Sequence, residues 1–218
     1  DFSADTAAAS VNVLVGSGND PSHRQGLAHF LEHMLFLGTA KYPTADEYQR
    51  FISENAGQHN AYTAFDHTNY FFTVKPDALV PALDRFADFF VNPLLDEAYI
   101  QREQHAVHSE YNARLRDEGR RQLDVIKTLV DQSHPFAKFS IGNLTTLSSG
   151  DKPVRDDLLQ FYQRYYVANN MTLSVIAPMP LDALEVEVRS RFSLVRHAPD
   201  FVADVFPEQV FADGVLPR

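Results

Sequence analysis

The feature that most constrains this chain is the segment His29-Phe-Leu-Glu32-His33, inside an apolar run from Gly26 to Phe36. In a helix of 3.6 residues per turn, the two histidines and the glutamate lie within about 100° of arc on one face. That face can offer two imidazole nitrogens to one metal ion and hold a carboxylate beside it. Two partly buried helical histidines beside an ion-paired glutamate would give the same spacing, so the motif alone leaves both interpretations open.

A third ligand must come from another part of the chain, and one predicted helix offers candidates. Residues 96 to about 130 contain no Pro and one Gly, and are rich in Glu, Arg, Gln and Ala, which predicts one long helix. Glu103 and Glu110 share one stripe of it, so one could ligate a metal while the other orients a ligand or a water. They could equally be solvated charges of a polar helix. His105 and His108 are rival donors that point about 100–200° away from this stripe.

A larger set of motifs resembles one family of metallopeptidases. Besides the residues already named, the similar segments are Met34-Leu-Phe-Leu-Gly-Thr39, Tyr42-Pro43, Glu47-Tyr48, Gly57, Asn60-Ala-Tyr-Thr63, His67-Thr-Asn-Tyr-Phe-Phe72, Ala82-Leu-Asp-Arg-Phe-Ala87 and His134-Pro-Phe-Ala-Lys-Phe139. Together they resemble the pitrilysin/insulinase family, whose zinc motif is the inverted form of His-Glu-x-x-His. The likeness is densest from Val11 to Leu147 and returns from Tyr165 to Pro178. It is nearest the large insulin-degrading and pitrilysin-type members rather than the mitochondrial processing type.

The resemblance implies a site and an activity. His29, His33 and Glu110 become the ligands of one zinc ion per chain, and Glu103 becomes a carboxylate that supports the ligands without binding zinc. Glu32 becomes the general base that deprotonates a zinc-bound water and can pass the proton to the leaving amine. The expected activity is that of a zinc-dependent metalloendopeptidase hydrolysing peptides or small proteins.

The resemblance also suggests how a substrate is held. Asn60, Ala61, Tyr62 and Thr63 match a segment that, in the family, is an exposed edge strand pairing with the extended substrate beside the zinc. Strand addition supplies main-chain hydrogen bonds that depend little on side-chain sequence. Without the resemblance, this segment reads as an ordinary strand that follows a turn at Gly57.

The chain's periodicity predicts an α+β fold. Together with the resemblance, it indicates a mostly antiparallel sheet flanked by helices, as in metallopeptidase domains of the pitrilysin/mitochondrial-processing-peptidase type. Strands are expected at 11–15, 60–63, 68–75 and 171–175, and helices at 26–36, 44–57, 77–90, 96–130, 153–166 and 181–192. Thr44 and Glu47 predict a capping box at the start of the second helix. The last helix is expected to bury Leu181, Leu184, Val188 and Phe192.

Residues 1–196 are expected to form one catalytic domain, and residues 197–218 an extended tail or linker in which prolines interrupt the patterning. The resemblance places this domain at the N-terminal, catalytic position and implies that the first strand or strands of the family domain are missing. Large members are several such domains long. The remaining domains of a parent protein or a homologous subunit are therefore expected partners, and the isolated domain is expected to be weakly active or inactive.

Composition excludes some functions. Nineteen basic against twenty-nine acidic residues give a net charge of −10 without a basic, aromatic-rich patch, so nucleic acid is not an expected partner. No apolar run approaches the roughly 20 residues that span a membrane. Cysteine is absent, which excludes thiolate metal sites. The protein is expected to be soluble, and no signal peptide is visible, so the compartment stays open between cytoplasm and periplasm.

Two alternative functions remain compatible with the residues. A specialised peptidase for a cofactor-precursor peptide would share every site residue named above. A non-catalytic zinc- or peptide-binding relative is the other alternative. A structural zinc site normally has four protein ligands, whereas three are placed here, and the open position is what hydrolysis needs.

Overall fold

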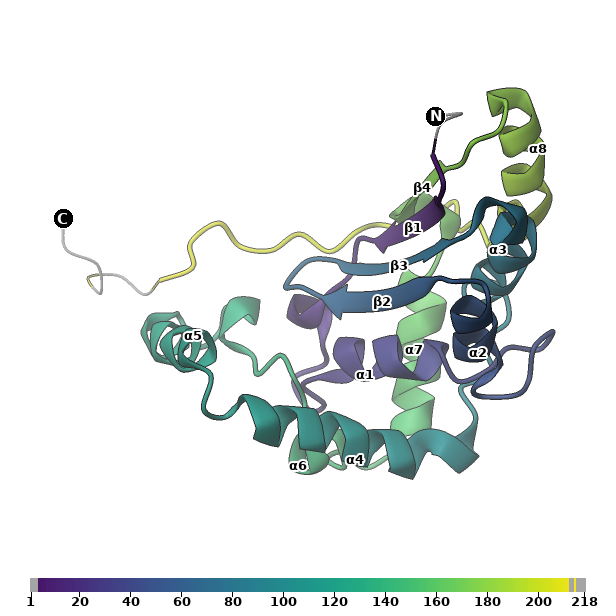
Figure 1. Ribbon diagram of the computed structural model, residues 1–218. Helices are drawn as coiled ribbons and strands as arrows, with labels where there is room; N and C mark the ends of the chain where they lie inside the picture. The colour runs from purple at the N-terminus through teal and green to yellow at the C-terminus, as the bar shows by residue number, and fades with distance from the viewer. Residues whose placement is uncertain (1–3, 212–213, 215–218) are drawn as a thin grey trace.

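The centre of the fold is an antiparallel sheet with helices packed around it (Figure 1). The computed structural model describes residues 4–211 and 214. In the sheet order β2-β3-β1-β4, the strands are β1 (Ala7–Val13), β2 (Gln58–Thr63), β3 (Thr68–Val74) and β4 (Met171–Ile176). Every pairing in it is antiparallel. The predicted fold class is therefore confirmed, and β2 and β4 are the two edges of the described sheet.

The two central strands pack large side chains against small ones. On the buried face, Phe72 of β3 pairs in register with Ala9 of β1, and Tyr70 pairs with Val11. Small residues on β1 leave room for the aromatic rings beneath the helices. Alternate residues of both strands are buried, as expected for strands with one face on a core.

Each of the six segments predicted to be helical contains a helix, with shifted ends, and one of them contains two. The helices are α1 (Leu27–Leu35), α2 (Glu47–Glu54), α3 (Leu79–Asp88), α4 (Glu97–Arg114), α5 (Glu118–Leu129), α6 (Leu144–Leu147), α7 (Val154–Tyr165) and α8 (Leu181–Phe192). The short helix α6 was not predicted. None of these helices is both long and apolar enough to cross a lipid bilayer.

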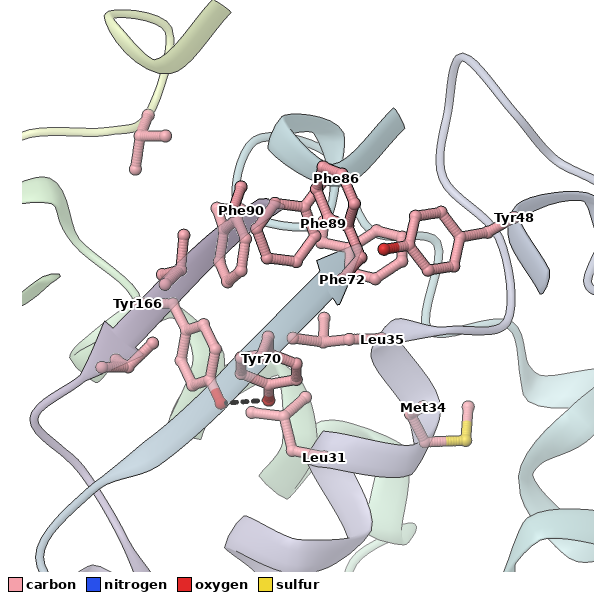
Figure 2. Packing of buried hydrophobic residues seen from close by; sticks show 14 of the residues in the cluster. Leu31, Met34, Leu35, Tyr48, Tyr70, Phe72, Phe86, Phe89, Phe90 and Tyr166 are labelled. Atoms are coloured by element: carbon pink, nitrogen blue, oxygen red, sulfur yellow. Dashed lines mark hydrogen bonds between the residues drawn. The ribbon is translucent and has the colours of Figure 1, made fainter. Parts of the chain in front are cut away.

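An aromatic cluster joins α3 to the sheet and to α1. Figure 2 shows Leu31 and Leu35 of α1 directed toward Tyr70, with the rings of Phe86, Phe89 and Phe90 beyond. The Tyr70 and Tyr166 hydroxyls are 2.7 Å apart, so that one donates a hydrogen bond to the other inside this apolar surrounding. Full burial of each such ring contributes about 2–3 kcal/mol. Leu79, Leu83 and Phe86, which form one stripe of α3, are buried in this cluster.

The prediction of one helix over residues 96–130 is wrong, because the chain bends between α4 and α5. Asp117 has extended backbone angles, and its side chain accepts a hydrogen bond from the Arg120 N–H. It therefore caps a new helix, just as Asp96 caps α4 by accepting from the Ala98 N–H. An aspartate competes with the helix for backbone donors, and here that local bond ends α4.

Three smaller expectations also need correction. The second helix begins at Glu47, because the Glu47 N–H donates to the Thr44 carbonyl in a turn and no capping box forms. Leu181 is 81% exposed, since it opens α8 beyond the reach of the core, whereas Leu184 is buried. The first strand begins at Ala7, because the run of small residues from 7 to 9 packs on the sheet face.

Residues 197–211 run extended along the domain and are fastened to it by side chains. The Phe206 ring packs 4.5 Å from Phe65, in the turn between β2 and β3. Asp204 accepts hydrogen bonds from Arg164 and Tyr165, each at 2.5 Å. The last part of the predicted tail, residues 212–213 and 215–218, lies outside the described residues. The described part thus braces the hairpin that carries β2.

Gly26, directly before α1, is expected not to tolerate a side chain. Its φ is +94°, and a Cβ there would lie 2.2 Å from the Cα of Gly142. Gly26→Ala should therefore lower the free energy of unfolding by more than about 2 kcal/mol, as measured by urea denaturation. Gly119→Ala is the matched control, because its Cβ meets nothing closer than 3.3 Å. It should stay within about 1 kcal/mol of the parent. Equal losses in both variants would contradict this assignment.

Candidate metal centre

The polar face of α1 looks into a cavity because its apolar face is fixed in the core. Phe30, Leu31 and Met34 are fully buried. At the start of the helix, the buried Asp20 carboxylate accepts hydrogen bonds from the N–H groups of Gly26 at 2.7 Å and Ala28 at 2.8 Å. These contacts satisfy donors that a helix N-terminus leaves open and set the rotation of α1.

α4 packs against α1 and brings a carboxylate to the two histidines. The Glu110 Oε2 atom is 3.5 Å from His29 Nε2 and 3.5 Å from His33 Nε2. One ligand atom from each of the three residues lies within 4.8 Å of the others. Among the described residues, no other set of three or more His, Asp or Glu side chains is grouped in this way.

Each of the three side chains is oriented by a further partner. His29 Nδ1 lies 2.7 Å from the Ile141 carbonyl oxygen, which only accepts, so Nδ1 carries the hydrogen. His33 Nδ1 lies 3.5 Å from Glu103. Arg114 holds the second Glu110 oxygen at 2.9 Å. Both imidazoles can therefore direct an Nε2 lone pair at a common point, the arrangement that metal-binding histidines normally have.

The two separations between a histidine and Glu110 fit a tetrahedral zinc ion. Two ligands bound about 2.0–2.1 Å from such an ion lie about 3.3–3.5 Å apart, and the two histidine–Glu110 separations are 3.5 Å. Two imidazoles and one carboxylate are also the donor set of catalytic zinc sites that keep one position open. The residues therefore fit this metal.

Opposite charges lie close together in this cluster and shift one another's pKa values. Burial alone would lower the pKa of His33, but hydrogen bonds to Glu103 and Glu110 outweigh it and raise the pKa to about 9. Hydrogen bonds from His29 and His33 hold the pKa of Glu110 well below its usual range. A hydrogen bond from His33 likewise lowers the pKa of Glu103. A bound cation would take the place of the protons that these carboxylates now share.

Glu32 is beside the three residues but outside their group. Its side chain is buried, with the residue 7% exposed, and the Thr63 hydroxyl donates a short hydrogen bond to its Oε2 atom. Burial raises the pKa of Glu32, while the nearby histidines and Thr63 act in the opposite direction. A carboxylate with a raised pKa can accept and release a proton near neutral pH.

The edge strand β2 forms one wall of a cavity of about 680 Å³ around this cluster. Asn60, Ala61, Tyr62 and Thr63 all line it. The Ala64 N–H donates to the His67 carbonyl at the hairpin end, and ladder alternation then turns the Ala61 N–H away from β3. That N–H instead donates to its neighbour's side-chain oxygen, Asn60 Oδ1, at 2.9 Å. Within the described residues, no strand pairs with this side of β2.

The residues singled out in the sequence thus fall into two groups. The structure brings together the histidines, Glu32, Glu103, Glu110 and residues 60–63 around one cavity. His105 and His108 do not line it. Sequence reasoning did not single out Asp20 or Arg114, although Arg114 stands four residues after Glu110, a spacing at which helical side chains meet. The Ile141 carbonyl has no sequence signal, since any residue supplies one.

The chain is similar to known families and proteins. The family described as "Insulinase (Peptidase family M16)" matches residues 1–130, and "Peptidase M16 inactive domain" matches residues 153–214. Human insulin-degrading enzyme is 42% identical over 96% of this chain, and the "Putative zinc protease mug138" of Schizosaccharomyces pombe is 41% identical over 98%. The chain spans about a fifth of the length of these relatives.

Solved structures show the same likeness in three dimensions. The crystal structure of pitrilysin superposes with a TM-score of 0.92 at 38% sequence identity, covering 99% of this chain and 23% of that one. The antiparallel sheet and its helices are therefore arranged as in that protein.

Proposed function

This chain belongs to the insulinase family of peptidases, M16, and from that premise we propose that it is the catalytic domain of a zinc-dependent metalloendopeptidase. The observation that carries the proposal is the group of His29, His33 and Glu110. Glu32 is buried beside this group and does not belong to it. The name of the fission yeast relative, a putative zinc protease, supports the choice of metal.

We propose that His29 Nε2, His33 Nε2 and one Glu110 oxygen hold the zinc ion. When bound, the ion would polarise a peptide carbonyl and lower the pKa of a water to about 7. Glu103 and the Ile141 carbonyl keep the two imidazoles in the metal-binding orientation, and Arg114 keeps the carboxylate turned toward them.

Glu32 would serve as the general base and acid. One carboxylate oxygen is held by the Thr63 hydroxyl, so the other is free to take a proton from the attacking water. The same oxygen can then give that proton to the leaving amine. Burial supports both steps, because it raises the pKa of the carboxyl group toward the pH at which the peptidase would operate.

A peptide substrate would add as a strand to the free edge of β2. It would displace the Asn60 side chain from the Ala61 N–H and pair with the main chain there. Because Thr63 lies on the same strand and contacts Glu32, a peptide on this edge lies next to the base. The relatives extend well beyond this chain, and we propose that their further domains help to enclose the substrate.

The first prediction concerns the metal. Replacing both His29 and His33 by alanine should abolish zinc binding, because one carboxylate remains of the three donors. Glu110→Gln should weaken zinc binding strongly while the circular dichroism spectrum stays that of the parent. Zinc content by elemental analysis after dialysis is the measurement, and His105→Ala is the control that should keep stoichiometric zinc. Full zinc in the double variant would rule out this site.

The second prediction separates Glu32 from the ligands. Glu32→Gln should retain zinc but lower the rate of peptide cleavage about 10²- to 10⁴-fold, since a carboxamide cannot accept the proton. Cleavage of a quenched fluorescent peptide should be followed with this chain and with the longest polypeptide that contains it. If zinc is lost in parallel with activity, Glu32 is a ligand and not the base.

The third prediction tests strand addition. Ala61→Pro removes the backbone donor that faces the free edge, so it should raise the Michaelis constant for three unrelated peptides together, with zinc content unchanged. Ala61→Ser keeps the donor and should leave all three constants close to the parent values. Unaltered constants in a folded Ala61→Pro variant would exclude strand addition and leave the zinc chemistry standing.

A further inference from the structure

Three arginines line the cavity that holds the candidate metal centre. They are Arg102 and Arg114 of α4 and Arg120 in the first turn of α5. Arg114 and Arg120 also line a smaller cavity of about 40 Å³ beside the main one. These two side chains therefore stand where the two cavities meet.

Two of the three arginines have carboxylate partners. Arg102 lies 3.1 Å from Glu103, and Arg114 lies 2.9 Å from Glu110. In the part of the chain that the structure describes, no carboxylate oxygen comes within 4.0 Å of the Arg120 guanidinium nitrogens. Arg120 is therefore a cavity cation whose five N–H donors lack an ionic partner.

The carboxylates that line the same cavity are already engaged. Glu110 faces the histidines and Arg114, and Glu103 faces His33 and Arg102. Glu32 accepts from Thr63. The fourth, Asp46, lies 3.6 Å from Arg50. A zinc ion bound as proposed above would add two positive charges to those of the arginines that line the cavity. The cavity then has unsatisfied positive charge on the side where α4 ends and α5 begins.

The neighbouring smaller cavity does not supply the missing anion. Its one acidic residue, Asp124, shares the lining with the cation Lys127. Glu118, which is also on α5, is paired with Arg121 at 2.9 Å. Arg120 thus lines both cavities, and neither lining places a carboxylate within 4.0 Å of its guanidinium nitrogens.

We propose that Arg120, together with the free N–H groups of Arg114, forms a subsite for a carboxylate of the peptide substrate. An acidic side chain and a C-terminal carboxylate present the same group, and a planar guanidinium binds either in a bidentate manner. Since Arg114 contacts Glu110, the subsite lies directly beside the residues that would hold zinc. The inference rests on the proposed function in taking a peptide as the ligand.

The test measures binding, so that it does not depend on cleavage. The chain with Glu32→Gln is titrated with fluorescein-labelled peptides of one neutral sequence, and fluorescence anisotropy reports the dissociation constant. One pair differs only by a central Glu or Gln, and a second pair only by a free or amidated C-terminus. At least one carboxylate-bearing peptide should bind about five- to tenfold more tightly than its neutral partner, and the difference should shrink as salt is added.

Arg120→Gln should remove that difference and leave the neutral peptides unaffected. Arg116→Gln is the matched control, because Arg116 is exposed, lines neither cavity and carries the same charge. A difference in dissociation constant within the Glu/Gln pair identifies a side-chain carboxylate as the ligand. A difference within the free/amidated pair identifies the C-terminal carboxylate. Equal constants within both pairs, no binding of any peptide, or a preference that survives in Arg120→Gln would each overturn the subsite. Selective binding, together with no cleavage by the longest zinc-loaded polypeptide that contains this chain, would instead overturn the proposed function alone.

Discussion

The burial of α1 is the constraint on which the rest of this structure depends. Its apolar face packs under Tyr70 and the rings of α3, and its first turn is tied to the buried Asp20 carboxylate. Because both the rotation and the start of the helix are set by these contacts, the opposite face can present His29 and His33 only to the cavity. The position of the candidate metal centre thus follows from core packing on the other side of one helix.

The cluster around α1 is a concentration of charge that the fold tolerates by pairing. Each carboxylate near the histidines shares a proton or an arginine, which keeps the cost of partial burial low. Such an arrangement costs more free energy than apolar packing of the same volume would. Glu32 differs from its neighbours, because burial raises its pKa while the others are lowered. Environment thus separates a candidate base from a candidate ligand.

The extended segment 197–211, which is distant from β2 in the sequence, contacts the turn beside the site. Phe206 packs on Phe65 in the turn that joins β2 to β3, and the Ser17 N–H donates to the Ala64 carbonyl in the same turn. Thr63, which holds Glu32, is two residues before Phe65. The edge strand is therefore fixed at its turn while its outer side stays unpaired in the described structure. An open sheet edge is what strand addition of an extended peptide requires.

The sequence by itself determined the elements with strong periodicity and the residues that share one helix. The buried stripe of α3 and the joint placement of His29, Glu32 and His33 follow from local spacing, which depends only on helix geometry. The break between α4 and α5 was missed because one capping bond at Asp117 outweighed good helix propensity. Spacing left Glu103 and Glu110 both open as candidate ligands, and only the resemblance pointed to Glu110. The tertiary structure decided that Glu110 meets the two histidines, that the Ala61 N–H faces outward, and that Arg120 has no acidic partner among the described residues. Those facts depend on contacts between segments far apart in the chain, and local spacing does not encode them.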